Sequence, residues 1–362
     1  MMKKVFKGLT FTGFAFIEPF ISLIKGKEVR KNGMVILKSA GLPIISIILF
    51  LVVAKLGSGT LYNIEAERRI EKARETGGEE AAITERECIE SGDKSCQPNV
   101  LPSPNKVWIA AVTLWDDIFE VKGKKEAFNK RVKKTNEQRK AKGLKPIEYT
   151  GRPSFADQVF TSLKTVLWGV LLAIFIAVPF GILLGLSKDM RNSTNWVIQI
   201  FKPVSPVVWL LLVSMVIKTV MAESDKDLAF TISFISVAFC AMWPTLVNTA
   251  LGVSTVDADI MNVVRVLKLG YIKQIYKVIL PSAIPLIFTG IRITVSVAWM
   301  VLIAIELLAQ SPGLGSFVWE EFQNGANDSN AKIIVAMFVI GIIGFLLDRL
   351  MFMFQKLFTI NA

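Results

Sequence analysis

The stretch TVLWGVLLAIFIAVPFGILLGLS, Thr165–Ser187, decides the fold, because it runs for 23 residues between two lysines without a charged side chain. A helix that crosses a membrane needs about 20 mostly apolar residues. Two further stretches meet this requirement: 228–256 has 29 positions without a charge, and 278–305 carries only Arg292. The sequence therefore predicts an all-α integral membrane protein.

Three weaker stretches bring the predicted number of transmembrane helices to six. Residues 39–54 form a short apolar run whose flanking lysines can snorkel to the interface. Residues 195–217 are interrupted by a lysine and two prolines, and 333–347 end at Asp348 and Arg349, which we expect to pair near the interface. An even number of spans places both termini on one side of the membrane.

The distribution of basic residues predicts which side that is. Lys and Arg in short loops stay cytoplasmic. Residues 25–38 contain five of them and 257–277 contain four, whereas 223–227 and 320–328 each contain three acidic residues. Both termini are therefore predicted to be cytoplasmic, and the long segment after the first span is predicted to be external.

Charge also divides the chain into a membrane part and one polar insertion. Of the 72 charged side chains, 35 lie within the 98 positions 58–155. The predicted organisation is a cytoplasmic segment 1–38, a first span 39–56, an external insertion 57–155, a core of five spans 156–352 with an inner loop 252–284, and a cytoplasmic tail 353–362. Within the first segment, Val5–Ile24 is expected to be an interfacial amphipathic helix, with a seventh span as the alternative.

Composition excludes several classes of enzyme. The chain has 362 residues, 42 Lys and Arg, 30 Asp and Glu, three cysteines and no histidine. Without histidine there is no Ser-His-Asp triad and no imidazole metal site, and three cysteines cannot form a four-thiolate zinc site. No G-x-x-x-x-G-K-[ST] loop is present, so the chain is not expected to be an enzyme, to hydrolyse ATP itself, or to hold a metal or cofactor.

The inner loop 252–284 is the most informative part of the sequence. Its first half predicts a short helix with one apolar face, formed by Ile260, Val263, Val264 and Leu267. Asp257 and Asp259 lie at its start, where acidic groups favour a helix N-terminus. A second helical pattern runs over 272–279, and Pro281 ends that helix or kinks it into the next. The apolar face is expected to enter a groove on a partner, or else to pack against the chain's own helix ends.

Two ionisable residues lie within the fifth predicted span. Arg292 and Glu306 are 14 residues apart, about 21 Å along a helix, so they cannot pair with each other directly. Both can be read as snorkelling to an interface, or Arg292 can add positive potential to an anion path. The scarcity of buried acids argues against an ion-coupled carrier.

Other features carry structural expectations. Cys88 and Cys96 are candidates for a disulfide in an oxidising compartment, with two free thiols as the alternative. Gly181 and Gly185 form a G-x-x-x-G pattern typical of close helix contacts. The basic run 122–145 has few aromatic residues, so nucleic acid is not an expected partner; it is a solvated face, or it attracts an acidic protein or anions.

Several segments together resemble the permeases of binding-protein-dependent ABC importers. Residues 262–267, Asn-Val-Val-Arg-Val-Leu, are similar to the loop variant of nitrate-type permeases, and Leu280-Pro281 matches the end of that loop. The family's usual Glu, Ala, Ala and Gly positions hold Asn262, Val263, Val264 and Lys268 here. Residues 288–292, Phe-Thr-Gly-Ile-Arg, and the proline-rich 202–209 continue the similarity, which covers 100–118 and 155–352.

The resemblance implies a bundle of six helices of the ABC importer permease type, with a set of partners. These are a second permease copy, cytoplasmic ATP-binding subunits that use ATP, an external solute-binding protein, and the bilayer of a bacterial inner membrane. The residues that it implies for coupling to the ATPase are Asp257, Asn262, Val263, Val264, Arg265, Leu267, Lys268, Leu280 and Pro281. Those considered for the translocation path are Lys202, Pro203, Pro206, Trp209, Arg292 and Glu306.

The implied substrate is a small oxyanion: nitrate, with nitrite, cyanate or bicarbonate as related possibilities. A taurine or alkanesulfonate importer is the alternative within the same class. An autonomous anion channel or an ion-driven carrier is the alternative from another class.

Overall fold

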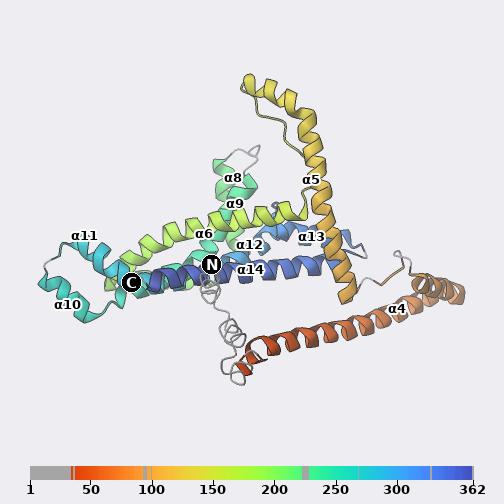
Figure 1. Cartoon of the computed structure of the whole chain (residues 1–362), viewed down its shortest axis with the longest axis horizontal. Coiled ribbons are helices and arrows are strands. Elements are labelled where there is room, and N and C mark those ends of the chain that lie inside the picture. Colours follow the sequence, from red (N-terminus) through yellow and green to blue (C-terminus); the bar gives the residue numbers. More distant parts are fainter. Residues whose placement is uncertain are drawn as a thin grey trace, which may run out of the picture. The chain divides into compact units, whose positions relative to one another are not determined.

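The computed structural model describes residues 34–35, 37–92, 96–98, 100–221, 228–267, 269–326 and 328–360. All regular elements in these ranges are helical (Figure 1). They are η1 (Leu37–Gly41), α4 (Leu42–Ser91), α5 (Pro104–Ala141), α6 (Phe155–Leu186), α7 (Lys188–Phe201), α8 (Pro206–Val220), α9 (Leu228–Ser254), α10 (Ala258–Val266), α11 (Tyr271–Gln274), η2 (Ile275–Ile279), α12 (Leu280–Ala309), α13 (Leu314–Asn324) and α14 (Ser329–Ile360). The helix expected over 5–24 lies outside the described residues.

Five of these helices are long and apolar enough to cross a membrane. They are α4, α6, α9, the run Tyr271–Ala309, and α14. The third predicted span, 195–217, is not one interrupted helix: α7 and α8 meet at an angle of 100°. If this bent pair counts as one crossing, the number of spans is six, as predicted.

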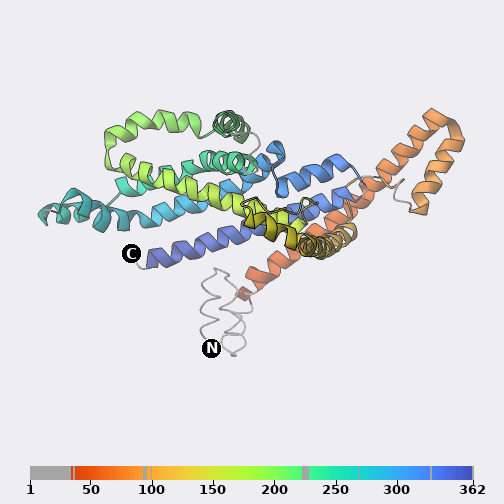
Figure 2. The same ribbon diagram turned by 90° about the horizontal axis from the view of Figure 1, so that it is seen from above.

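The described chain divides into two compact units. One contains residues 159–316 and 340–360, and the other contains 37–158 and 317–339. In the first unit, α6, α9 and α12 run alongside one another, while α8 lies across them (Figures 1 and 2). This unit holds the buried core and the inner loop.

Small residues let the helices of the first unit approach closely. A Cβ atom added at Gly181 would lie 2.6 Å from Cβ of Thr249, and one at Gly185 would lie 2.5 Å from Cβ of Val253. The G-x-x-x-G pattern is therefore confirmed as a contact between α6 and α9. At the α9–α12 contact, the hydroxyls of Thr245 and Thr294 are hydrogen-bonded at 2.8 Å.

Prolines inside α6, α9 and α12 do not interrupt these three helices. Pro179, Pro244 and Pro285 each lie inside a helix. Before Pro281 the chain forms the π-helical turn Ile275–Ile279, which leads into α12 without a gap. Proline removes a helix hydrogen bond and its ring clashes with the carbonyl four residues earlier, so a departure from regular α-helical geometry is expected just before Pro281.

The second unit carries the polar insertion. The boundary expected at residue 57 falls inside α4, which continues to Ser91. Gly78 adopts φ 79° within it, a conformation that suits glycine, and the helix folds back on itself beyond that point (Figure 2). Ala82 and Ile89 of the returning limb are buried.

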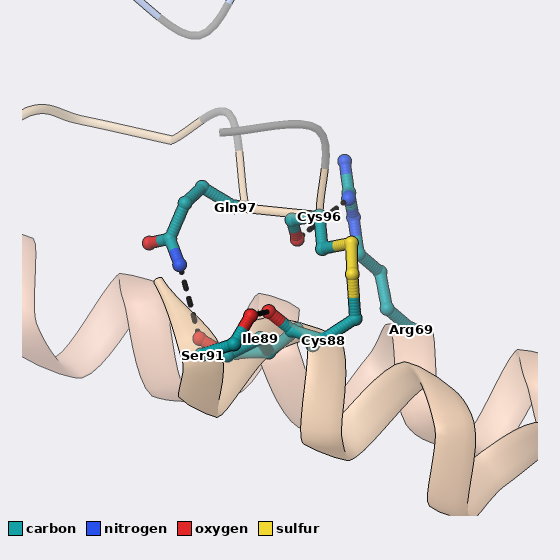
Figure 3. The surroundings of a disulfide bond; sticks show 6 residues. All are labelled: Arg69, Cys88, Ile89, Ser91, Cys96 and Gln97. Atoms are coloured by element: carbon teal, nitrogen blue, oxygen red, sulfur yellow. Dashed lines mark hydrogen bonds between the residues drawn. A yellow bond between two sulfur atoms is a disulfide. The ribbon is translucent and has the colours of Figure 1, made fainter. Parts of the chain in front are cut away.

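The returning limb is tied to the segment that follows it. Cys88 and Cys96 are joined by a disulfide with their Cα atoms 5.7 Å apart (Figure 3). The side-chain amide of Gln97 donates to the carbonyl of Ile89 at 3.0 Å, and Arg69 donates to the carbonyl of Cys96 at 3.3 Å. A disulfide and two hydrogen bonds thus hold this turn.

Candidate functional site

The inner loop begins with a capped helix. The carboxylate of Asp257 accepts a hydrogen bond from the backbone N–H of Asp259 at 2.9 Å, and its carbonyl accepts from Met261 at 3.1 Å. These bonds satisfy donors that the first turn of α10 otherwise leaves without partners. Asp257 therefore fixes where the loop helix starts, as its position in the sequence predicts.

The apolar residues of α10 do not share one environment. Val264 is 4% exposed, whereas Leu267 is 63% exposed and Ile260 is 41% exposed. The interpretation of Val264 and Leu267 as one partner-facing surface needs correction, because Val264 is buried and Leu267 is exposed. Asn262 is exposed. The side chains of Val263 and Arg265, and the whole of Lys268, lie outside what the structure describes.

Further exposed apolar side chains follow from the end of α10 onward. Besides Ile260, the exposed large apolar or aromatic side chains of the loop are those of Val266, Leu267, Tyr271, Ile272 and Tyr276; we call these five residues the loop surface. The apolar pattern of the sequence did not indicate Val266, Tyr271 or Tyr276 as exposed residues of the loop. The helical pattern over 272–279 is the signal that could have found Tyr276. Leu280 and Pro281, expected to take part in coupling, are half-buried in the first turn of α12.

The bend between α7 and α8 carries the residues considered for the translocation path. Ser205 caps α8 by accepting a hydrogen bond from the N–H of Val207, and Pro206 occupies the first turn, where its missing N–H costs nothing. Lys202 and Pro203 are exposed at this bend. The two prolines thus separate two helices rather than kinking one.

Trp209, close to the bend, packs in a cluster of aromatic side chains. Its buried ring stacks on Phe239 with the centroids 5.3 Å apart, and it lies 5.9 Å from Phe201. Phe201 also stacks on Trp243, which is buried. Among the described residues, no acceptor meets the indole N–H of Trp209 or of Trp243. The cluster packs the bend against α9.

Arg292 takes a partner that the sequence analysis did not assign. Its Nε and Nη2 atoms donate to the two carboxylate oxygens of Asp348 at 2.7 and 2.9 Å, and its guanidinium lies 5.1 Å from the ring of Phe352. Asp348 was expected to pair with its neighbour Arg349. The positive charge of Arg292 is therefore engaged by a carboxylate from α14 rather than left free.

Glu306 is fully buried, so the interpretation of this residue as snorkelling to an interface is wrong. Its two oxygens accept from the hydroxyl of Ser162 at 2.7 and 2.8 Å, and Oε2 also accepts from the N–H of Gly315 at 2.9 Å. The Ser162 hydroxyl oxygen in turn accepts from the N–H of Leu314 at 2.9 Å. This carboxylate joins α6, α12 and the start of α13.

The turn before α13 and the start of α13 leave no room for side chains beside Glu306. A Cβ atom at Gly315 would lie 2.7 Å from Cβ of Glu306, and Gly313 has φ 158° at the edge of the region that favours glycine. Gly313 lies in the turn between α12 and α13, and Leu314 and Gly315 are the first two residues of α13.

The path candidates therefore fall into three groups. Trp209 lies at the bend with Lys202, Pro203 and Pro206, Arg292 lies against α14, and Glu306 lies in the α6–α12 contact. No hydrogen bond or ion pair among the described residues joins one group to another. Arg292 and Glu306 each bond to another helix, and these bonds are structural contacts.

The basic helix α5 is mostly solvated. The N–H groups of Lys124 donate to the carboxylate of Glu120 at 2.6 Å on its surface, and this hydrogen bond lowers the pKa of Glu120. Such exposed pairs contribute little to stability. Beyond this pair, Lys130, Arg131, Lys133 and Lys134 are exposed.

The disulfide predicts a distinct labelling pattern. We expect alkylation of the denatured, unreduced chain to label one cysteine, Cys240, which is the free cysteine among the described residues. After reduction, three should be labelled. Intact-mass spectrometry counts the labels, and a Cys240→Ser variant should shift the pattern to none before and two after reduction. Three labels before reduction would show that the two thiols are free.

Comparison with known proteins places the chain in a family. The family described as "Binding-protein-dependent transport system inner membrane component" matches residues 169–359, which is more than half of the chain. The chain therefore belongs to this family of inner-membrane, multi-pass ABC importer permeases. The polar insertion lies outside the matched range.

Individual relatives agree with this assignment. The nitrate import permease protein NrtB of Synechococcus elongatus is 36% identical over 193 residues, which are 53% of this chain and 66% of the relative. The bicarbonate transport system permease protein CmpB of the same organism is 35% identical over 201 residues, 55% of this chain and 68% of the relative. The chain thus spans about two thirds of each relative's length.

A solved structure also aligns with the chain. It is the methionine ABC transporter MetNI in an inward-facing conformation, with a TM-score of 0.48 and 15% identity, and the alignment covers 57% of this chain and 96% of that one.

Proposed function

We propose that this chain is the transmembrane permease subunit of an ATP-driven importer for a small oxyanion, most simply nitrate. The similarity to permeases named for nitrate and for bicarbonate supports an oxyanion as the substrate class. The chain is 36% identical to the nitrate permease and 35% identical to the bicarbonate permease, so the two sequence identities are nearly equal. Bicarbonate is therefore the second candidate, ahead of taurine or another sulfonate.

The proposed assembly contains two copies of this chain, two cytoplasmic ATP-binding subunits and an external solute-binding protein. Both termini and the loop 252–284 face the cytoplasm, in agreement with the basic residues of that loop. ATP is bound by the partner subunits and not by this chain.

One observation carries the proposal: the side chains of the loop surface are exposed and apolar or aromatic, and they follow a capped helix. Asp257 caps α10 and Val264 is buried, whereas Leu267 is 63% exposed. An exposed apolar surface on a polar loop is typical of a protein–protein contact. A short rigid helix seated in a groove of an ATPase can transmit its motion to the spans.

The test is uptake by proteoliposomes that contain the chain, the ATP-binding subunits and the solute-binding protein. Leu267→Asp should abolish both co-purification with the ATP-binding subunits and ATP-dependent nitrate uptake, because it places a charge at the centre of an apolar contact. Asn192→Asp adds the same charge at an exposed site on α7 and should leave both unchanged.

Two results would contradict the proposal. Nitrate uptake by the chain alone, without ATP or partner subunits, would favour an autonomous channel or carrier. Normal co-purification of Leu267→Asp would remove the loop surface from the interface. Replacing nitrate by bicarbonate or taurine in the same vesicles separates the substrate candidates.

A further inference from the structure

A cavity of about 450 Å³ lies between the end of α6, one face of α7 and the end of α9. Its apolar wall includes Leu184, Ile198 and Leu251, and its polar rim includes Arg191, Asn195 and Thr255. All of these residues belong to the same compact unit. The cavity is separate from the loop surface and from the contacts of Arg292 and Glu306.

The rim offers hydrogen-bond donors that the protein does not use. Among the described residues, none forms an ion pair with Arg191 or accepts a hydrogen bond from it, and the same holds for the side-chain amide of Asn195. The two residues are four apart on α7, so they share one face. Asp189 is two residues from Arg191 and therefore faces away from it. A half-buried guanidinium without an acid beside it favours an anionic oxygen as ligand.

The opposite rim offers acceptors. The hydroxyls of Ser254 and Thr255 both donate to the carbonyl of Leu251, at 3.1 and 2.8 Å. Their protons are therefore engaged, and their oxygen atoms are left to accept. A ligand that fills this rim should present an anionic group on the α7 side and hydroxyl groups on the α9 side.

Two helices independently place the cavity at the membrane surface. The charge-free stretch 165–187 ends four residues before Arg191, and the charge-free stretch 228–256 ends directly after Thr255. The rim therefore lies at the level of lipid headgroups, and the apolar wall lies on the side of the hydrocarbon core. A free inorganic anion would leave that wall without a partner.

We propose that this cavity binds an anionic phospholipid whose headgroup carries hydroxyls, of the phosphatidylglycerol type. Arg191 and Asn195 donate to the phosphate, the oxygens of Ser254 and Thr255 accept from the glycerol hydroxyls, and Leu184, Ile198 and Leu251 contact the start of an acyl chain. The proposal does not depend on what the chain transports.

The test is titration of the purified full chain, in a detergent with an uncharged headgroup, with short-chain phosphatidylglycerol, followed by native mass spectrometry. We expect one tightly bound lipid, and affinity at least about tenfold lower for Arg191→Gln, because a charge-assisted contact is lost. Lys188→Gln removes the same charge from the same helix outside the cavity and should bind as the unmodified chain does. Thermal melting of both variants checks that they are folded.

Two further ligands identify the source of the anion. Short-chain phosphatidylcholine has the phosphate but neither the net charge nor the headgroup hydroxyls, and it should bind more weakly. Inorganic phosphate should neither bind alone nor displace the lipid at millimolar concentration. Equal binding of phosphatidylglycerol by Arg191→Gln, or displacement by inorganic phosphate, would overturn the proposal.

Discussion

Replacing Glu306 by leucine is expected to lower the free energy of unfolding by about 2–6 kcal/mol. The substitution removes the acceptor of two buried donors, the hydroxyl of Ser162 and the N–H of Gly315. Each buried donor left without an acceptor costs about 1–3 kcal/mol. Water cannot replace the carboxylate, because a leucine side chain fills the same space in a site that is fully buried. Equilibrium unfolding in mixed detergent micelles measures the loss.

Glu306→Gln is the matched control, because it keeps the shape and one acceptor oxygen but removes the charge. Its oxygen can still accept from Gly315, and its amide can donate to Ser162, so we expect a clearly smaller loss than for Glu306→Leu. Equal losses for the two variants would mean that the charge, and not the hydrogen bonding, stabilises the turn. Unchanged stability of Glu306→Leu would contradict a structural role for this contact.

The spans could be predicted from the sequence because a membrane imposes a simple rule. A helix needs about 20 apolar residues to cross, and the absence of charge from 165–187 or 228–256 satisfies that rule without reference to the rest of the fold. The G-x-x-x-G pattern predicted a close helix contact for a similar reason, because two glycines on one face allow close approach to whichever helix is adjacent. These are local properties.

The partners of the polar residues could not be predicted, because they are not local. Ser162 and Glu306 are 144 residues apart, and Arg292 and Asp348 are 56 apart. Helical periodicity states which residues share a face, but not which other helix covers that face. Val264 and Leu267 illustrate the limit: both fitted one apolar stripe, yet only the packing of the loop decides that the first is buried and the second exposed.

The bend between α7 and α8 could be predicted only in part from the sequence. Pro203 and Pro206 marked the interruption in the sequence, because proline removes a helix hydrogen bond. The sequence did not specify the angle of 100° between the two helices. At the bend, Trp209 stacks on Phe239, which lies 30 residues further along the chain, so the packing around the bend is not local.

Separating Arg292 from Asp348 should have the other large effect. Arg292→Gln or Asp348→Asn is each expected to cost about 2–4 kcal/mol of unfolding free energy, because the remaining charge loses its bidentate partner. The two side chains are 34% and 30% exposed, and both lie on helices that are long and apolar enough to cross a membrane, where a lone charge is costly. ATP-dependent uptake should fall with the loss of folded protein.

The double variant Arg292→Gln, Asp348→Asn tests whether the two residues act as a pair. It leaves no lone charge, so it should be no less stable than either single variant, and the cycle should give a coupling energy of about 1–3 kcal/mol. The exposed pair Glu120 and Lys124 on α5 is the control within the same chain: neutralising both should show no measurable coupling, because water already solvates each charge. If the losses at Arg292 and Asp348 simply add, the two residues stabilise the chain independently, and the contact between α12 and α14 does not rest on their ion pair.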